Sequence, residues 1–501
     1  MAISGGIVEA NKVKRVVIAG GGTAGWIAAA ALIKELKPLL DITLVESDEI
    51  GTVGVGESTI PTTRAFHGIL GIYEKAFVAA TQSTFKLGIE FENWNKVGDR
   101  YFHAFGSVGK SVWMADFQHF WLEAVRQGFG GDYVDYSFEG AAAKANKFET
   151  HDGASIAYAY HLDATAYAKF LRGLAEPAGV KRVEGKIKQV VQNPETGFVE
   201  ALELESGVRI EGDLFLDCTG FRALLSEGTL KTGFEDWSHW LATDAALAVQ
   251  TEPTGPAVPY TRAIAHENGW RWRIPLQTRV GNGFVFCTDY MSEDEARAQF
   301  LGAIEGKPLF DPRLLRFKAG MRKQSWTKNV IAMGLSSGFI EPLESTSIHM
   351  IKIAVTRLIQ NFPFDGITDA LTDRFNAQSR REMEHVRDFI ILHYKLTERD
   401  DSPFWRRCRD MEIPASLAER IRLFRENAMA YQGGDEMFRI DSWIMVMLGQ
   451  GIQPQSYHHL ARMMEPGQLE KALTDLKAGI AHQVAKLPDH QQFFESYAPA
   501  A

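Results

Sequence analysis

The chain has 501 residues, of which 45% are hydrophobic and 23% are charged, and its formal net charge is −9. This composition is that of a globular protein and excludes a disordered or fibrous chain. The negative balance argues against nucleic acid as the main partner, because nucleic-acid binding requires a basic surface.

The three cysteines, Cys218, Cys287 and Cys408, are widely separated. Their spacing predicts neither a disulfide framework nor a zinc cluster, and we expect no metal site. Residues 1–14 contain no apolar core of a secretory signal. No apolar run approaches the roughly 20 residues that span a bilayer. We therefore expect a soluble, cytoplasmic protein without a membrane partner.

The first elements in chain order form a nucleotide-binding pattern. Residues 14–19 (KRVVIA) predict a short buried strand, residues 20–25 (GGGTAG) a turn, and residues 26–36 an alanine-rich helix. A second strand, over residues 41–45, ends at Glu46. This is G-x-G-x-x-G between a strand and a helix, with an acidic residue at the expected distance, and it predicts a dinucleotide site.

The residue types of this turn suit a pyrophosphate. Gly20 permits the tight turn, Gly22 lets the backbone approach the phosphates, and Gly25 lets the helix pack on the strand. The helix N-terminus stabilises phosphate charge, and Glu46 can accept hydrogen bonds from ribose hydroxyls.

Residues 84–91 alternate apolar and polar side chains with period two. This pattern predicts one strand, with Lys86 among the charges of its solvated face. On physical grounds alone, Lys86 is an ordinary surface lysine.

Two later stretches extend the nucleotide domain. Residues 209–217 predict a strand followed by a small-residue turn at 218–220, and residues 329–333 predict another followed by a turn at 334–338. A nucleotide domain assembled from three distant stretches is typical of FAD-dependent oxygenases and reductases, which favours FAD over NAD. No second G-x-G-x-x-G lies between a strand and a helix, so we expect electrons to come from a separate protein.

The segment 269–275 (GWRWRIP) alternates large side chains. A strand of this kind would pack Trp270 and Trp272 on one face and leave Arg271 and Arg273 solvated. None of these side chains is a nucleophile, so physical reasoning alone indicates a structural strand.

Residues 340–347 (IEPLESTS) contain a helix start. Pro342 is expected in the first turn of that helix or just before it. The helix N-terminus would offer backbone N–H groups to an anion beside the flavin. Glu344 must be paired if it points inward; alternatively, Glu341 and Glu344 interact with the helix dipole on a solvated turn.

Four segments carry a resemblance to a known family. GGGTAGW at 20–26, GESTIP at 56–61, WRWRIP at 270–275 and GFIEPLEST at 338–346 resemble the flavin-dependent halogenases, often called tryptophan halogenases. The similarity runs from the first strand to about residue 460. The WxWxIP segment distinguishes this family from ordinary flavin monooxygenases.

The fold that we expect is α/β. Residues 1–365 should form a Rossmann-like FAD-binding domain of the flavin monooxygenase type, with an inserted β-sheet at about 235–320. Residues 366–501 lose glycine and gain helical patterning, and they should form a helical substrate-binding cap.

The resemblance also implies the chemistry. In that family, reduced FAD and oxygen convert a halide into hypohalous acid, and a lysine and a glutamate direct it onto an aromatic ring. Lys86 and Glu344 match these catalytic residues. A desolvated lysine can react as an amine, which arginine cannot, and excluding water prevents escape of the oxidant. We expect both side chains in a dry chamber that is connected to the flavin site but distinct from it.

The remaining site residues follow from the same resemblance. The backbone N–H groups of Thr346 and Ser347 match the halide site, which leaves chloride and bromide open. His103 and Phe105 match residues that hold the aromatic substrate by stacking, although His103 alone also suits a structural histidine. The flavin contacts are expected at Gly20, Gly22, Thr23, Ala24, Gly25, Glu46, Glu57, Ser58, Ile187, Leu335 and Ile348.

Residues 436–448 depart from the enzymes that act on free tryptophan. Those enzymes bind the amino-acid part with an acidic residue, a Phe-Trp pair and an asparagine, whereas this segment is apolar and lacks the pair. The departure favours an indole, another aromatic without an amino-acid part, or a peptide or other tailored substrate, free or carrier-bound.

The sequence leaves three functions open. The first is a two-component halogenase, a monomer or homodimer that receives FADH2 from a separate flavin reductase and acts on a small aromatic substrate. The second is a flavin monooxygenase that hydroxylates an aromatic substrate and does not need Lys86. The third is a non-catalytic flavoprotein, which would turn over nothing.

Overall fold

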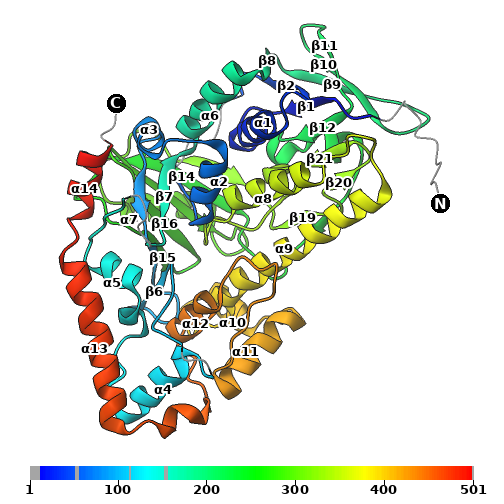
Figure 1. Ribbon diagram of the computed structural model, residues 1–501. Helices are drawn as coiled ribbons and strands as arrows, with labels where there is room; N and C mark the ends of the chain where they lie inside the picture. The colour runs from blue at the N-terminus through cyan, green and yellow to red at the C-terminus, as the bar shows by residue number, and fades with distance from the viewer. Residues whose placement is uncertain (1–11, 51–55, 112–113, 152–155, 499–501) are drawn as a thin grey trace, which may run out of the picture.

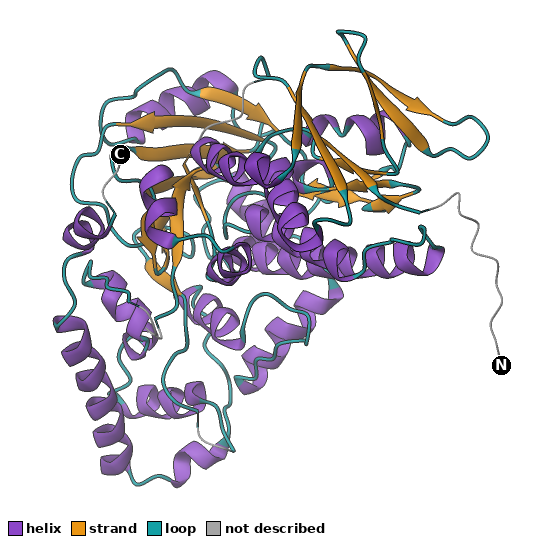
Figure 2. Cartoon of the chain, turned by 45° about the horizontal axis from the view of Figure 1, so that its top comes forward, coloured by secondary structure: helices purple, strands orange, loops and turns teal. Residues whose placement is uncertain are grey.

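The structure of the protein is a computed structural model that describes residues 12–50, 56–111, 114–151 and 156–498. The sheets and the helices that flank them occupy one end of the molecule, and most of the C-terminal helices occupy the other (Figure 1). Coloured by secondary structure, the strands gather in the first part and the second part is almost entirely helical (Figure 2).

A six-stranded sheet carries the nucleotide-binding pattern. Its strand order is β20-β21-β12-β1-β2-β8, and β1 pairs in parallel with both β2 and β12. Four of the five residues of β1 are buried, as expected for the β-branched centre of a parallel sheet. The strands are β1 (Arg15–Ala19), β2 (Asp41–Glu46), β8 (Lys181–Glu184), β12 (Leu214–Asp217), β20 (Trp326–Thr327) and β21 (Val330–Ala332).

Helix α1 (Thr23–Leu36) begins in the glycine turn after β1 and packs against α6 (Ala164–Ala178) and α8 (Ser347–Gln360). The strand predicted over 209–217 is two strands, because Gly212 and Asp213 interrupt the extended backbone. Its first part joins a separate three-stranded sheet of order β11-β10-β9. The strands of that sheet are β9 (Ile187–Gln192), β10 (Val199–Leu204) and β11 (Arg209–Glu211).

A seven-stranded sheet of order β18-β14-β17-β16-β15-β5-β6 lies beside the nucleotide domain. Five of its strands come from the region where an inserted sheet is expected, and β5 and β6 come from much earlier in the chain. The strands are β5 (Gly88–Glu92), β6 (Arg100–Ala104), β14 (Ala245–Thr251), β15 (Thr261–His266), β16 (Gly269–Pro275), β17 (Val280–Phe286) and β18 (Arg313–Arg316).

The prediction that Arg271 and Arg273 are solvated is wrong. Strand β16 lies between β15 and β17, and all seven of its residues are buried, the two arginines included. Each guanidinium lies within 4 Å of the Glu305 carboxylate, which compensates the charge that the sheet removes from water.

Two smaller sheets complete the strands. The first, of order β3-β7-β4, consists of β3 (Gly56–Ser58), β4 (Thr84–Lys86) and β7 (Ala159–Asp163). The second, of order β13-β19-β22, consists of β13 (Phe234–Asp236), β19 (Gly320–Arg322) and β22 (Gly338–Phe339).

The strand predicted over 84–91 is also two strands, β4 and β5, that belong to different sheets. They separate at Leu87, whose N–H donates to the carbonyl of Pro259 at 2.7 Å and whose carbonyl accepts from Phe105 N–H at 2.8 Å. Lys86 is consequently enclosed on every side and is 0% exposed. The expectation of a solvated lysine is therefore wrong.

Helices α9 to α14 follow the sheets in the sequence, and α4 and α5 pack against α13, so that lobe also includes residues from earlier in the chain. No helix in the described ranges is long and apolar enough to cross a membrane. The parallel sheet with flanking helices confirms the predicted α/β class. The remaining helices are α2 (Thr62–Leu70), α3 (Glu74–Ala80), α4 (Phe117–Gln127), α5 (Phe138–Lys144), α7 (Glu293–Ala303), α9 (Asp369–Lys395), α10 (Pro403–Asp410), α11 (Ala415–Asn427), α12 (Ile440–Gly449), α13 (Pro466–Ala485) and α14 (His490–Tyr497).

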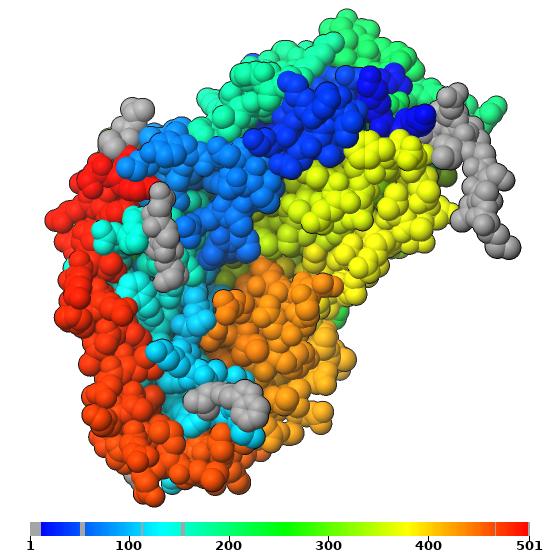
Figure 3. All heavy atoms as spheres, viewed as in Figure 1, coloured from blue at the N-terminus to red at the C-terminus, as the bar shows by residue number. Residues whose placement is uncertain are grey.

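The last helix, α14, returns to the sheets and packs against β4. Figure 3 shows the C-terminal residues along one flank of the molecule. The Phe85 N–H donates to His490 Nε2 at 3.1 Å, and His490 Nδ1 donates to the carbonyl of Ala257 at 2.7 Å. Burial lowers the pKa of His490 to about 4, so its ring is neutral and can act as an acceptor.

Candidate active site

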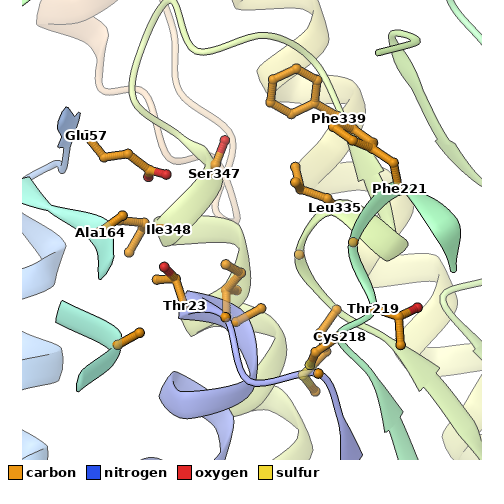
Figure 4. Close-up of a pocket in the computed structure, with 18 of the residues that line it drawn as sticks. Thr23, Glu57, Ala164, Cys218, Thr219, Phe221, Leu335, Phe339, Ser347 and Ile348 are labelled. Atoms are coloured by element: carbon orange, nitrogen blue, oxygen red, sulfur yellow. The ribbon is translucent and has the colours of Figure 1, made fainter. Parts of the chain in front are cut away.

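A cavity of about 1500 Å³ opens at the carboxyl ends of β1, β2, β12 and β21. This is where ligands bind in open α/β sheets. Figure 4 shows Glu57 and Ser347 on one side of the cavity and Phe221, Leu335 and Phe339 on the other. The expected flavin contacts that line it are Gly20, Gly22, Thr23, Ala24, Glu46, Glu57, Ser58, Ile187, Leu335 and Ile348.

The glycine turn has the geometry that a phosphate-binding turn requires. Gly20 has φ +108°, in the region that favours glycine. Gly25 lies below the cavity rather than in its wall, and a Cβ there would stand 1.9 Å from the Gly20 carbonyl oxygen. The first turn of α1 has no side-chain cap, so its N–H groups face the cavity without a competing acceptor. These residues fit a dinucleotide.

The carboxylate of Glu46 is held beside that turn. It accepts from Arg182 Nε at 2.5 Å and from Trp26 Nε1 at 3.3 Å. A Cβ at Gly21 would collide with Glu46 Oε2, so the absence of a side chain there is what admits the carboxylate. Glu46 is thus placed where a ribose would lie next to the glycine turn.

A second helix N-terminus reaches the same cavity. Thr346 is the N-cap of α8, Ser347 is its first residue, and both line the cavity. No side chain caps this helix, so its first backbone N–H groups lack an internal partner and suit an anion. Pro342 lies before the helix, one of the two placements that the sequence allows.

Lys86 lies behind this cavity, at the end of β4. Its Nζ donates to Ser345 Oγ at 2.9 Å, to Ser58 Oγ at 3.2 Å and to the carbonyl of Thr59 at 3.4 Å. Burial lowers the pKa of Lys86 to about 7, against the opposing effect of the Glu344 charge. A large fraction of this amine is therefore neutral at physiological pH.

Glu344 is 2% exposed and lies between two imidazoles. His103 Nδ1 is 3.0 Å from its carboxylate oxygens, and His393 Nε2 is also 3.0 Å from Oε1. Burial raises the pKa of Glu344, but His103 and His393 outweigh burial and hold it at about 2. The carboxylate is ionised, and its hydrogen-bond partner is a histidine rather than Lys86.

His103 and Phe105, the expected substrate residues, both lie beside the catalytic candidates. His103 uses Nδ1 for Glu344, and its ring centroid is 5.6 Å from that of Phe389 and 6.4 Å from that of Phe438. The Phe105 ring centroid is 5.4 Å from Lys86 Nζ. An aromatic surface therefore adjoins both the amine and the carboxylate.

Two serines lie between the large cavity and Lys86, which with the buried side chains of Glu344, His103 and His393 forms the group that we call the chamber. Ser58 and Ser345 line the cavity, whereas Lys86, Glu344 and His103 do not. The two hydroxyl oxygens are 2.5 Å apart, and both accept from Lys86. The two compartments are thus adjacent and share a wall made of small hydroxyl side chains.

The sequence reasoning missed several residues of this chamber. Ser345 follows Glu344 directly, so its proximity to the site was open to inference. His393 sits near the end of the long helix α9, where its Nδ1 is 2.8 Å from the hydroxyl of Tyr101. No local pattern marks His393 or Tyr101, because they meet only when α9 packs on β6. Within the described ranges, no group of three or more His, Cys, Asp or Glu residues could hold a metal ion.

Known proteins match this chain over most of its length. The family model described as tryptophan halogenase matches residues 15–466. Tryptophan 7-halogenase RebH from Lentzea aerocolonigenes is 34% identical over 484 residues, which cover 89% of this chain and 91% of RebH. Among solved structures, Xcc4156, a flavin-dependent halogenase from Xanthomonas campestris, is 51% identical with a TM-score of 0.96, covering 98% of this chain and 99% of that one. BrvH, a flavin-dependent halogenase from Brevundimonas sp. BAL3, is 43% identical with a TM-score of 0.94, covering 97% and 100%.

Proposed function

Because the chain belongs to the tryptophan halogenase family, we propose that it chlorinates or brominates an indole-like aromatic substrate through Lys86 and Glu344. The family resemblance predicted from the four sequence segments is confirmed, and the chain is a flavin-dependent halogenase. The substrate, the halide and the roles of individual residues belong to the proposal.

One observation carries the proposal: a fully buried amine with a pKa of about 7 adjoins the flavin-sized cavity. Lys86 can exist as a free amine at neutral pH, whereas an exposed lysine would be an ammonium ion. A neutral amine can attack hypohalous acid, forming an N–halogen bond and releasing water, and so retain the halogen close to the substrate. The monooxygenase alternative gives this buried lysine no task.

The residues of the large cavity suit the cofactor side of the reaction. When bound there, reduced FAD supplies hypohalous acid from oxygen and a halide. The glycine turn and the start of α1 would hold the pyrophosphate, and Glu46 the ribose. The N–H groups of Thr346 and Ser347 would hold the halide. A separate flavin reductase would supply FADH2.

Glu344 suits the role of proton acceptor. Halogenation of an aromatic ring forms a carbon–halogen bond and releases the ring proton, and Glu344 is an ionised carboxylate in the same chamber. A cationic ring intermediate is a far stronger acid than any carboxylic acid, so a pKa of about 2 does not prevent the transfer. The carboxylate also stabilises the positive charge on the ring.

The aromatic wall indicates the substrate class. Phe438 stacks on Phe389 with centroids 3.6 Å apart, close to His103. Helix α12, in the segment that departs from the enzymes acting on tryptophan, buries Trp443, Ile444 and Met445. Such a wall can orient a flat ring and offers little to an amino-acid group, which favours an indole or a similar aromatic.

The test supplies a flavin reductase, NADH, FAD, bromide and indole, and follows the products by mass spectrometry. The expected product is bromoindole, recognised by the bromine isotope pattern. A hydroxylated product without bromoindole would instead favour the monooxygenase. Recovery of unchanged indole, with neither product, would favour a non-catalytic flavoprotein. Competition between chloride and bromide then settles the halide.

A further inference from the structure

The backbone that presents Glu344 is unusual. Glu341 has φ +97° and Ser345 has φ +61°, values that residues with a side chain rarely adopt. Glu341 also precedes Pro342, and a proline drives the residue before it towards extended conformations with negative φ. Such a conformation persists only where surrounding contacts hold it in place.

The contacts that hold it come from the Glu341 side chain. Glu341 is 1% exposed, and its carboxyl accepts from Thr243 Oγ1 at 2.7 Å. The hydroxyl of Tyr394 lies 2.9 and 3.0 Å from its two oxygens. Thr243 precedes β14 and Tyr394 belongs to α9, so one carboxyl joins the seven-stranded sheet to the helical lobe.

Aromatic side chains close the space around this carboxyl. The indole of Trp270, from the WxWxIP strand, interacts with Glu341. The Trp94 ring centroid lies 6.0 Å from that of Trp270 and 5.3 Å from that of Tyr394. Glu341 is removed from water, so the hydrogen bonds that Thr243 and Tyr394 donate to it have no competing partner.

The turn that follows Glu341 determines where the side chains of Glu344 and Ser345 lie. The Ser345 N–H donates to the carbonyl of Pro342 at 3.1 Å, which closes a tight turn with Glu344 near its apex. From this turn Glu344 reaches His103, and Ser345 receives the Lys86 amine. Rotation of the backbone at Glu341 would swing both side chains away from Lys86.

We propose that Glu341 is a positioning residue: its anchored carboxyl holds the strained turn that keeps Glu344 and Ser345 against Lys86. It thereby sets the fraction of hypohalous acid that reaches the ring rather than escaping. The inference rests on the proposed function, since it concerns how well the oxidant is used. A purely structural role would change stability and leave that fraction unaltered.

The experiment measures bromoindole formed per FADH2 consumed, and traps released hypobromous acid with a freely diffusing phenol. Glu341→Ala is expected to lower bromoindole per FADH2 by about tenfold and to raise trapped oxidant correspondingly, because a small misplacement of reacting groups is costly. The rate of FADH2 oxidation should stay within about twofold, because Glu341 itself does not line the flavin cavity. Glu341→Gln, which keeps one acceptor oxygen, should restore most of the loss.

Two comparisons make the test specific. Glu123, on α4 in the helical lobe, is another buried carboxylate that accepts a hydrogen bond from a tyrosine, Tyr457. Glu123→Gln should leave bromoindole per FADH2 unchanged. In a Glu344→Ala background, adding Glu341→Ala should lower the ratio by a smaller factor than it does in the wild-type enzyme, because Glu341 acts in part through Glu344.

A folded Glu341→Ala enzyme with the wild-type ratio would overturn the inference, as would independent, multiplying losses in the Glu344→Ala background. If Glu341→Ala does not fold, Tyr394→Phe decides, since it removes one anchor and should lower the ratio by about threefold. If the wild-type enzyme forms bromoindole and the Glu341→Ala and Tyr394→Phe variants form as much of it per FADH2, only this inference is contradicted. A wild-type enzyme that forms neither bromoindole nor hypobromous acid contradicts the proposed function itself.

Discussion

The flavin cavity and the chamber around Lys86 share a wall and are built by opposite means. The cavity presents glycines and two helix N-termini without side-chain caps, so the groups in it that suit an anion belong to the backbone. The chamber presents ionisable side chains from β4, β6, α9 and the turn before α8, all removed from water. Backbone dipoles bind an anion without a buried net charge, whereas a buried amine has its pKa displaced. The proposed function thus separates cofactor recognition from reactivity in space.

The strongest test of this difference is Lys86→Met. Bromoindole per FADH2 should fall at least about 100-fold while FADH2 oxidation continues, because the amine is lost and the cavity is intact. Lys352→Met is the matched control: burial also lowers the pKa of Lys352 to about 7, but its amine donates to Thr63 outside the chamber. Product analysis should show Lys352→Met within about twofold of wild type. Equal losses of bromoindole per FADH2 in both variants would mean that removing any buried lysine impairs the enzyme, and that Lys86 has no special role.

The backbone side of the comparison is tested by Gly25→Ala. A Cβ at this position would lie 1.9 Å from the Gly20 carbonyl oxygen, so α1 must shift away from the turn. The dissociation constant for FAD, measured by fluorescence titration, should rise about 30-fold, which corresponds to about 2 kcal/mol of overpacking. Gly173→Ala in α6 adds a methyl group to open space and should leave FAD affinity unchanged. At saturating FAD, bromoindole per FADH2 should be normal in both variants.

The protonation state of Lys86 predicts a pH profile. Its pKa is about 7, so the neutral amine is the minor form below that pH and the major form above it. Bromoindole per FADH2 should rise about tenfold per pH unit below 7 and level off above it. Glu344, with a pKa of about 2, stays ionised from pH 5 to 9 and adds no second limb. A profile that falls above pH 7 would assign the ammonium form instead, as a hydrogen-bond donor to hypohalous acid.

The last test concerns stability rather than activity. The pKa of Lys86 is about 7 in the fold against 10.5 in the unfolded chain, so the unfolded state binds more protons between these values. The free energy of unfolding therefore gains about 1.4 kcal/mol per pH unit from this residue as pH rises through the window, and below pH 7 the penalty is complete. Lys86→Met should be more stable than wild type in urea at pH 7.5, with a smaller advantage at pH 9.5. Equal advantages at both pH values would contradict the burial of a neutral amine.

The elements around the glycine turn could be predicted from the sequence because their signals are local. The two strands lie within one residue of their expected positions, and the helix begins at Thr23, three residues before its expected start. The glycines, the alanine-rich helix and Glu46 all act within about thirty residues of one another, so one stretch of sequence contains the motif.

Predictions failed where distant strands meet. The alternating pattern around Lys86 is that of a solvated strand face, and Lys86 is enclosed only because β4 and β5 separate into different sheets. Arg271 and Arg273 are buried because the sheet gains β15 and β17 on either side of β16. His393 reaches Glu344 only through the packing of α9. The expectation that Lys86 and Glu344 belong to one site came from family resemblance, since no periodicity relates residues so far apart.

The hydrogen bond between Phe85 and His490 spans 405 positions and finishes the strand that carries Lys86. Ribosomes release a chain in order, so the glycine turn, the WxWxIP segment and the turn before α8 all emerge before this last partner exists. A nascent or truncated chain that lacks α14 contains every motif named here. In such a chain, β4, the strand that carries Lys86, lacks the hydrogen bond from Phe85 to His490. The strand that carries Lys86 is thus completed only after the residues that line the large cavity have been translated.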